Sequence, residues 1–275
     1  MQKLVDEFVA SSSGFKVQGN LDKKHTEIVG AAEKNIKNLN SKNFRNWEKQ
    51  NDVGLSYYIT YLEKLFLDEK RVFFFSRIIK LIRKRLAHIF LYSSMLDDIS
   101  ILESLNAKDL LLENPQNKTP GSADFIKVSG YSVSFRWLRY LYITNQIRAK
   151  KLISKDGLWL DIGSYYGGLQ GIVKKYNPEI KIFLLDFNHQ LLRSYIYLKN
   201  LYPNANHILP SKVKEYKNSK QLPSGSIVYV EINDFKTLSK FNFDLVTNFV
   251  SFGEMKKKTF NEYFKSKIFE HSKNI

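Results

Sequence analysis

The chain has 275 residues, with 43 Lys and Arg against 27 Asp and Glu, and no cysteine. With 43% hydrophobic and 25% charged residues, the composition is that of a globular protein and excludes a fibrous or fully disordered chain. The lack of cysteine excludes disulfides and thiolate metal sites, which agrees with a cytoplasmic location. We expect no transmembrane segment and no secretory leader, because no apolar run is long enough and the chain turns acidic at Asp6 and Glu7.

The net charge of +16 raises the question of an anionic partner. Of the 43 cations, 34 are Lys and only 9 are Arg, and residues 121–275 carry +12 of the excess. Recognition of phosphates and bases usually depends on the forked guanidinium of Arg. The composition therefore favours a solvated, Lys-rich surface over nucleic-acid binding, while the basic C-terminal half suits anionic substrates or cofactors.

Residues 1–120 are predicted to be mainly helical. Apolar residues recur at helical spacing in 23–50 and 54–67, and residues 71–92 combine a wide apolar face with six Lys and Arg. A basic amphipathic helix of this kind could lie on an anionic membrane surface as a peripheral contact. Packing in a helical bundle, with the cations reaching solvent, is the favoured alternative.

A Pro- and Gly-containing stretch at 114–122 marks the predicted boundary between two parts of the chain. Residues 121–150 form a connecting loop and a helix from Arg136 to Ile147. Residues 151–275 form the second domain, in which short apolar runs alternate with helices. This alternation predicts a doubly wound, Rossmann-like α/β domain. The predicted strands are 158–160, 181–185, 207–209, 227–232 and 243–247, and the predicted helices are 169–176, 189–201 and one from about residue 257.

The strongest signal for a ligand site lies between the first strand and the first helix of this domain. The segment Asp161-Ile162-Gly163-Ser164-Tyr165-Tyr166-Gly167-Gly168 forms a glycine-bearing turn, where the backbone can approach a ligand closely. Asp186 ends the next strand, 19 residues after Gly167. An acid at that position of a nucleotide-binding α/β domain accepts hydrogen bonds from ribose hydroxyls.

The motifs resemble those of S-adenosylmethionine-dependent methyltransferases. A nicotinamide fingerprint needs glycine at the position that Tyr165 occupies, whereas the order of hydrophobic residue, Asp, any residue and Gly, with an acid closing the second strand, is similar to the first two methyltransferase motifs. The segment from Asp244 to Met255 closely resembles the fourth-strand motif of a bacterial family of sugar O-methyltransferases. Gly130-Tyr131 and Leu138-Arg139-Tyr140 resemble that family's region before the first strand. The resemblance covers about residues 121–270.

This resemblance implies a class I methyltransferase sheet, S-adenosylmethionine as cofactor and an acceptor hydroxyl on a sugar, nucleotide sugar or glycan of polysaccharide biosynthesis. The implied cofactor-binding residues are Asp161, Gly163, Ser164, Tyr165, Gly167, Asp186 and Phe187. Removal of the hydroxyl proton requires a base, and the implied catalytic residues are Glu254 and Asn248. His207 and His271 are weaker candidates for the base, and no metal site is expected.

Two departures from the family leave other functions open. Tyr165 replaces a glycine and imposes a steric cost if the turn needs a positive φ. The strands that normally follow the fourth one do not occur before Ile275, so we expect a C-terminally incomplete sheet with low activity. Its last strand would have a bare edge, apart from what a short C-terminal tail or a partner chain offers. The alternatives are an RNA or DNA methyltransferase, although the segment after Asn248 lacks the prolines typical of base methylation, and a degenerate, non-catalytic binding protein.

Overall fold

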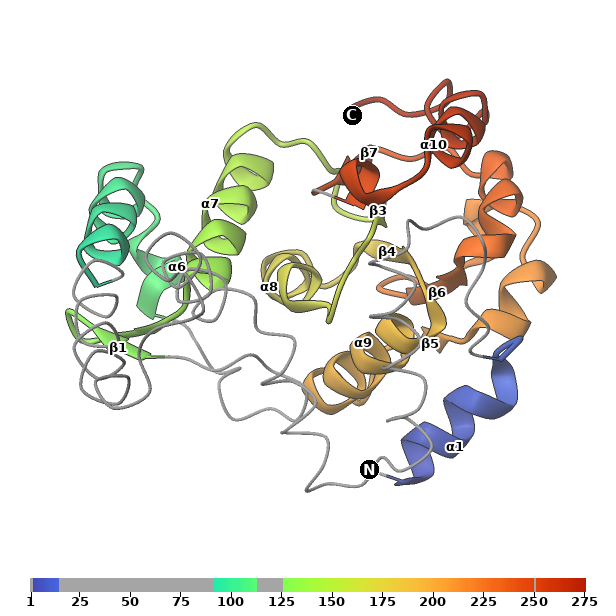
Figure 1. Ribbon diagram of the computed structural model, residues 1–275, viewed down its shortest axis with the longest axis horizontal. Helices are drawn as coiled ribbons and strands as arrows, with labels where there is room; N and C mark the ends of the chain where they lie inside the picture. The colour runs from blue at the N-terminus through green and yellow to red at the C-terminus, as the bar shows by residue number, and fades with distance from the viewer. Residues whose placement is uncertain (1, 15–91, 113–125, 250) are drawn as a thin grey trace, which may run out of the picture.

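A five-stranded parallel sheet forms the centre of the molecule (Figure 1). The fold comes from a computed structural model, in which residues 2–14, 92–112, 126–249 and 251–275 are described. The strand order is β5-β6-β4-β3-β7, and every neighbouring pair is parallel. The strands are β3 (Leu158–Ile162), β4 (Lys181–Asp186), β5 (His207–Ile208), β6 (Ile227–Glu231) and β7 (Leu245–Asn248). The predicted Rossmann-like α/β architecture is confirmed at this level.

Both faces of the sheet are covered, because successive side chains of a strand point to opposite faces. All five residues of β3 are buried, and Trp159 and Leu160 belong to two different apolar clusters. The Trp159 cluster includes side chains of α7 (Phe135–Ala149), α8 (Gly168–Tyr176) and α9 (Asn188–Leu201). The Leu160 cluster includes side chains of the 3₁₀ helices η2 (Pro210–Glu215) and η4 (Ile232–Lys240) and of α10 (Lys257–Phe264). A further 3₁₀ turn, η3, spans Ser219–Gln221.

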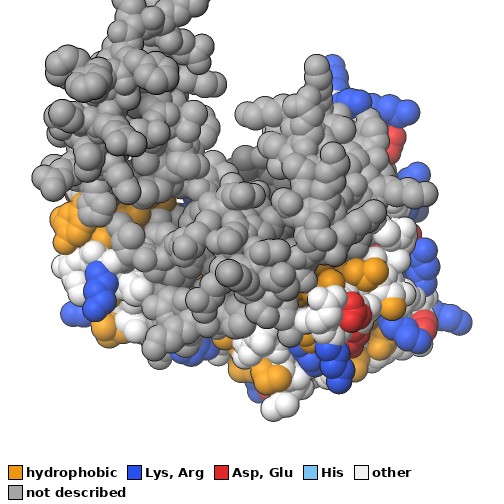
Figure 2. Space-filling view, turned by 60° about the horizontal axis from the view of Figure 1, so that its bottom comes forward, with side chains coloured by type: hydrophobic (Ala, Val, Ile, Leu, Met, Phe, Trp, Pro, Cys, Tyr) orange, Lys and Arg blue, Asp and Glu red, His pale blue; other side chains and the backbone are white. Residues whose placement is uncertain are grey.

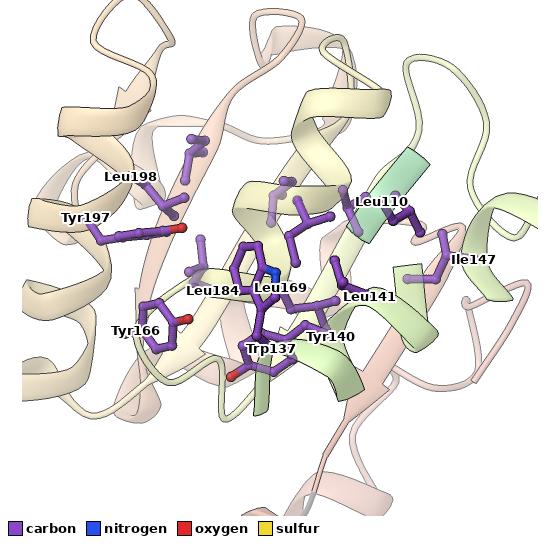
Figure 3. Packing of buried hydrophobic residues seen from close by; sticks show 14 of the residues in the cluster. Leu110, Trp137, Tyr140, Leu141, Ile147, Tyr166, Leu169, Leu184, Tyr197 and Leu198 are labelled. Carbon is purple, nitrogen blue, oxygen red and sulfur yellow. The ribbon is translucent and has the colours of Figure 1, made fainter. Parts of the chain in front are cut away.

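Helix α7 confirms the helix predicted from Arg136 to Ile147. It begins after Ser134, whose hydroxyl accepts a hydrogen bond of 3.2 Å from the Trp137 amide, and this cap satisfies one of the free N–H groups of the first turn. Figure 3 shows Trp137, Tyr140 and Leu141 of α7 gathered beside Leu169 of α8, all of them buried. Helix α7 is therefore part of the same apolar layer as the helices that follow β3 and β4.

The described parts of residues 1–120 are helical but pack in two different places. Helix α1 (Gln2–Ser11) lies against α9, and the fully buried Phe8 ring packs 5.9 Å from Tyr195 and 6.4 Å from Tyr229. Residues 92–104 are helical, and α6 (Lys108–Leu112) packs against α7 on the opposite side of the molecule (Figure 1). The helices predicted at 23–50, 54–67 and 71–91 and the loop at 114–122 lie outside the described residues.

A short hairpin precedes α7 and was not predicted. Strands β1 (Ile126–Val128) and β2 (Tyr131–Val133) are antiparallel, and their turn places Ser129 at φ 47° and Gly130 at φ 85°. A Ser-Gly pair is a recognised turn signal, and glycine accepts a positive φ without strain. The Gly130-Tyr131 pair therefore serves this turn.

The outer edge of β7 is not bare. The Val246 amide donates a hydrogen bond of 3.0 Å to the Asn274 carbonyl, and the Lys273 amide donates one of 3.0 Å to Phe243. The Lys273 ammonium lies 2.6 Å from the Asp244 carboxylate. The edge is therefore not bare over residues 243–246, because the short C-terminal tail after α10, which the sequence left open as a cover, returns to pair with this strand.

Candidate functional site

The carboxyl ends of β3, β4, β6 and β7 meet at one edge of the sheet. In the register of the sheet, Asp186 at the end of β4 is the partner of Glu231 at the end of β6, and Asn248 at the end of β7 is the partner of Ile162. Open α/β sheets bind their ligands outside this edge. The structure therefore brings together the predicted loop after β3, Asp186 and Asn248. The structure adds Glu231. Like Asp186, it is an acidic residue at the end of an apolar strand, and this sequence feature could have identified it.

Glycines shape the loop between β3 and α8. Gly163 has φ 82° and Gly167 has φ 86°, and the latter caps the start of α8. A Cβ atom added to Gly163 would lie only 2.5 Å from the Ser251 Cβ, which belongs to the 3₁₀ helix η5 (Ser251–Glu254). Gly163 therefore serves both the turn and the close approach of two loops.

Tyr165 adopts the left-handed conformation that the sequence analysis identified as costly, with φ 56°. Its amide donates a hydrogen bond of 2.9 Å to the Asp186 carboxylate, and its carbonyl accepts one of 2.5 Å from the Ser194 hydroxyl. The guanidinium groups of Arg136 and Arg193 lie 4.0 Å and 4.8 Å from the centre of its ring. The surroundings thus hold a non-glycine residue in this conformation.

We expect Tyr165→Gly to lower the free energy of unfolding by about 1–2 kcal/mol. Relief of the left-handed backbone returns about 1 kcal/mol, but each lost cation–π contact removes about 0.5–2 kcal/mol. The control is Lys151→Gly, because Lys151 has φ 50° and an exposed side chain, so this variant gains the backbone relief without losing an aromatic ring. Denaturant unfolding that ranks the two variants in the opposite order would contradict this account.

Asp161 lies inside the protein and is only 3% exposed. Its carboxylate accepts hydrogen bonds from the Gln170 amide and, at 2.7 Å, from the Thr247 hydroxyl. The Thr247 oxygen in turn accepts a hydrogen bond of 2.8 Å from the Trp159 indole. Burial raises the pKa of Asp161 to about 7, although the two hydrogen bonds oppose the rise. Asp161 therefore ties β3, α8 and β7 together beneath the loop.

Asp186 stands at the edge of the sheet beside the loop. Its carboxylate accepts hydrogen bonds of 2.7 Å from the Phe187 amide and 2.9 Å from the Tyr165 amide. The Phe187 ring is half-buried and stacks on His189 at 5.9 Å. Ser164 is buried, and its hydroxyl has no hydrogen-bond partner among the described residues. The predicted cofactor residues therefore surround one edge, with Asp186 and Phe187 at its rim and Asp161 beneath it.

The catalytic candidate Asn248 is engaged in holding the loop after β7. Its amide nitrogen donates to the Ile162 carbonyl at 2.8 Å and to the Ser251 hydroxyl, and its amide oxygen accepts from the Phe252 amide at 3.1 Å. These bonds fix η5 against the end of β3. They point to a positioning role for Asn248. Glu254 ends η5 at this same edge, and its side chain lies outside the described part of the structure.

The two histidines considered as weaker bases lie elsewhere. His207 starts β5, so it lies at the opposite edge of the sheet, where its ring contacts the Tyr229 hydroxyl and the Tyr202 carbonyl, both at 2.9 Å. Burial lowers the pKa of His207 to about 4. His271 is exposed and follows α10. Neither histidine lies in the loop cluster around Asp186.

A cavity of about 420 Å³ opens at the amino ends of the strands, away from this site. It is lined in part by Lys174, whose ammonium donates to the Pro178 carbonyl at 2.9 Å and to the Gly225 carbonyl at 2.7 Å. Burial lowers the pKa of Lys174 to about 8. This lysine links the loops that precede β4 and β6, which is a structural role. In the described ranges, no group of three or more His, Asp or Glu side chains is arranged to hold a metal ion.

Comparison with family models, with curated proteins and with solved structures found no match for this chain. Within the residues that the structure describes, no helix is long and apolar enough to cross a membrane. The functional conclusion therefore rests on the geometry of the loop cluster and on the sequence motifs.

Proposed function

We propose that this protein binds S-adenosylmethionine at the carboxyl edge of the sheet and transfers its methyl group to a hydroxyl of a sugar or polysaccharide precursor. One observation carries the proposal. The glycine-bearing loop after β3 lies against the acid that ends β4, and the Tyr165 amide is hydrogen-bonded to Asp186 at 2.9 Å. A loop and an acid on adjacent strands are the arrangement by which α/β sheets bind nucleosides.

The residues of this edge fit such a cofactor. Asp186 would accept hydrogen bonds from the ribose hydroxyls, and the half-buried Phe187 would lie beside the nucleoside. The backbone at Gly163 and Gly167, both with positive φ, would approach the amino-acid part. The Ser164 hydroxyl, which has no hydrogen-bond partner among the described residues, lies in the same loop. When bound, the cofactor supplies an electrophilic methyl group. Asp161 would act indirectly, by fixing the strands beneath the loop.

For methylation of a hydroxyl, the protein must also hold the acceptor in line and take up its proton. We assign the role of the base that takes up the hydroxyl proton to Glu254, which follows β7 at the edge where the acceptor would enter. Asn248 would position this loop through its hydrogen bonds to Ile162 and Phe252. Among the described side chains visible in Figure 2, Lys and Arg lie in several separate groups beside the grey residues. A sugar acceptor is preferred to nucleic acid because only 9 of the 43 cations are Arg, the side chain on which phosphate and base recognition usually depends.

One observation favours a second candidate, a cofactor-binding protein without catalysis. The amide atoms of Asn248 are engaged with the protein itself, so this side chain brings no reacting group to the acceptor. Transfer of a labelled methyl group to sugar acceptors separates the two functions. Binding of the cofactor without transfer to any hydroxyl would support the second candidate.

We expect Asp186→Asn to weaken S-adenosylmethionine binding at least about 10-fold, since a hydrogen bond to a charged acceptor contributes about 1.5–3 kcal/mol. Isothermal titration measures the affinity, and the melting temperature shows whether the variant is folded. The matched control is Asp156→Asn at the opposite edge, where Asp156 pairs with Lys181 at 2.5 Å. Equal affinity of the folded Asp186→Asn variant and the parent would contradict the assignment.

A further inference from the structure

The segment after α1 lies over the same edge of the sheet as the proposed cofactor site. The Ser13 amide donates a hydrogen bond of 2.7 Å to one oxygen of the Glu231 carboxylate, and the Ser13 hydroxyl donates to the other oxygen. The side-chain amide of Asn188 donates a hydrogen bond to the Gly14 carbonyl. Glu231 is the last residue of β6, and Asn188 follows the end of β4, although Ser13 lies more than one hundred residues from both in sequence.

These contacts hide a buried acid that lies next to Asp186. Glu231 is 4% exposed and is the register partner of Asp186, so the two carboxylates end neighbouring strands. A carboxylate at this position accepts hydrogen bonds only. Ser13 supplies donors to both of its oxygens, and these are the atoms that a hydroxyl or amino group of a ligand would use. A ligand that reaches Glu231 must therefore compete with Ser13.

The segment is anchored in a way that allows it to move while α1 stays in place. Phe8 is fully buried, and the Ser11 hydroxyl lies 2.7 Å from the Ser211 hydroxyl. Ser13 itself is exposed, and a Cβ added to Gly14, which has φ 94°, would meet no atom of the described residues within 4 Å. Ser13 and Gly14, which follow the Ser11 anchor, are thus held to the described part of the protein by hydrogen bonds to Glu231 and Asn188.

We propose that Ser13 and Gly14 form a strap that occupies the Glu231 carboxylate, and that a nucleoside bound at this edge displaces the strap. The inference rests on the nucleoside half of the proposed function and does not depend on methyl transfer. The strap lowers the affinity for the ligand by the strength of its own contacts. Glu231 becomes a ligand contact when the strap leaves.

The test compares Ser13→Ala with Ser12→Ala in titrations with adenosine and with S-adenosylmethionine. Ser12 is the matched control, because its hydroxyl donates to the Val9 carbonyl at the end of α1 and does not touch Glu231. We expect Ser13→Ala to bind adenosine about 5- to 10-fold more tightly than the parent, the factor that corresponds to one hydrogen bond. Ser12→Ala should bind as the parent does.

Hydrogen exchange of the amides of residues 12–14 gives the second readout, in the parent protein with and without saturating adenosine. Faster exchange with adenosine bound supports displacement, while slower or unchanged exchange overturns it, because the segment would then be a fixed wall or a closing lid. Equal adenosine affinity of the two Ala variants also overturns it. Adenosine binding with strap release but no binding of S-adenosylmethionine contradicts the proposed function alone. Absence of binding by both ligands overturns both proposals.

Discussion

Gly163→Ala is expected to destabilise the protein by about 3 kcal/mol and to distort the loop between β3 and α8. Two effects add up at this position. A side chain at φ 82° costs about 1–2 kcal/mol, and overpacking costs about 1–3 kcal/mol more. The overpacking follows from the 2.4 Å between the added Cβ and the Ser251 oxygen. Denaturant unfolding measures the change in the free energy of unfolding.

The double variant Gly163→Ala/Ser251→Gly separates the two causes. Removing the Ser251 side chain abolishes the clash but leaves the backbone cost, and it also removes the hydrogen bond of 3.1 Å from Ser251 to the Ile162 carbonyl. We expect a coupling energy of about 1–3 kcal/mol between the two substitutions, the range for residues in contact. Strict additivity would contradict the close approach of these loops. It would leave the positive φ as the sole reason for glycine.

Local patterns in the sequence were sufficient to predict the sheet. The continuous apolar run 158–160 predicted a strand buried on both faces, and β3 extends this run through Asp161 to Ile162. Helices α8 and α9 begin within one residue of their predicted starts, because loops or prolines bound them on each side. Whether the short C-terminal tail covers the edge of β7 stayed open in the sequence, since a few tertiary hydrogen bonds determine the return of residues 273–274.

The candidate site was predicted in its loops but not in its contacts. Gly163, Gly167 and Asp186 lie where the motifs placed them, because strand ends and positive-φ turns leave clear signals in sequence. The engagement of Asn248 by its own loop left no such signal. Neither did the cover that Ser13 provides for Glu231, since these residues meet only after folding. Tyr165 looked like a defect in sequence, yet two arginines surround its ring.

The titration of Asp161 should make the free energy of unfolding depend on pH, and Asp161→Asn should remove this dependence. The pKa of Asp161 is raised from 3.8 to about 7 by burial. Between pH 4 and 7 the folded state therefore keeps a proton that the unfolded state has lost, and this contribution to stability falls as the pH rises. The variant cannot ionise. Its stability relative to the parent should thus increase by about 3–4 kcal/mol from pH 4 to pH 7.5, the equivalent of two to three pKa units.

The local structure can accept this substitution. The Gln170 carbonyl oxygen is buried and has no hydrogen-bond partner among the described residues, so a rotated Gln170 amide can accept from the new amide group while Thr247 continues to donate.

Asp109→Asn is the control, for which the stability difference from the parent should change with pH in the opposite direction. The hydrogen bond from Arg148 lowers the pKa of Asp109, so its contribution is present above the unfolded pKa and is lost as the pH falls. Relative to the parent, that variant should therefore lose stability as the pH rises, while Asp161→Asn gains it. Urea unfolding at several pH values measures both differences, and a flat difference for Asp161→Asn would show that the carboxylate stays ionised in the core. In that case an ionised Asp161 would lie beneath the loop between β3 and α8. The hydrogen bonds from Gln170 and Thr247 alone would then stabilise this buried charge and fix the geometry beneath the proposed cofactor site.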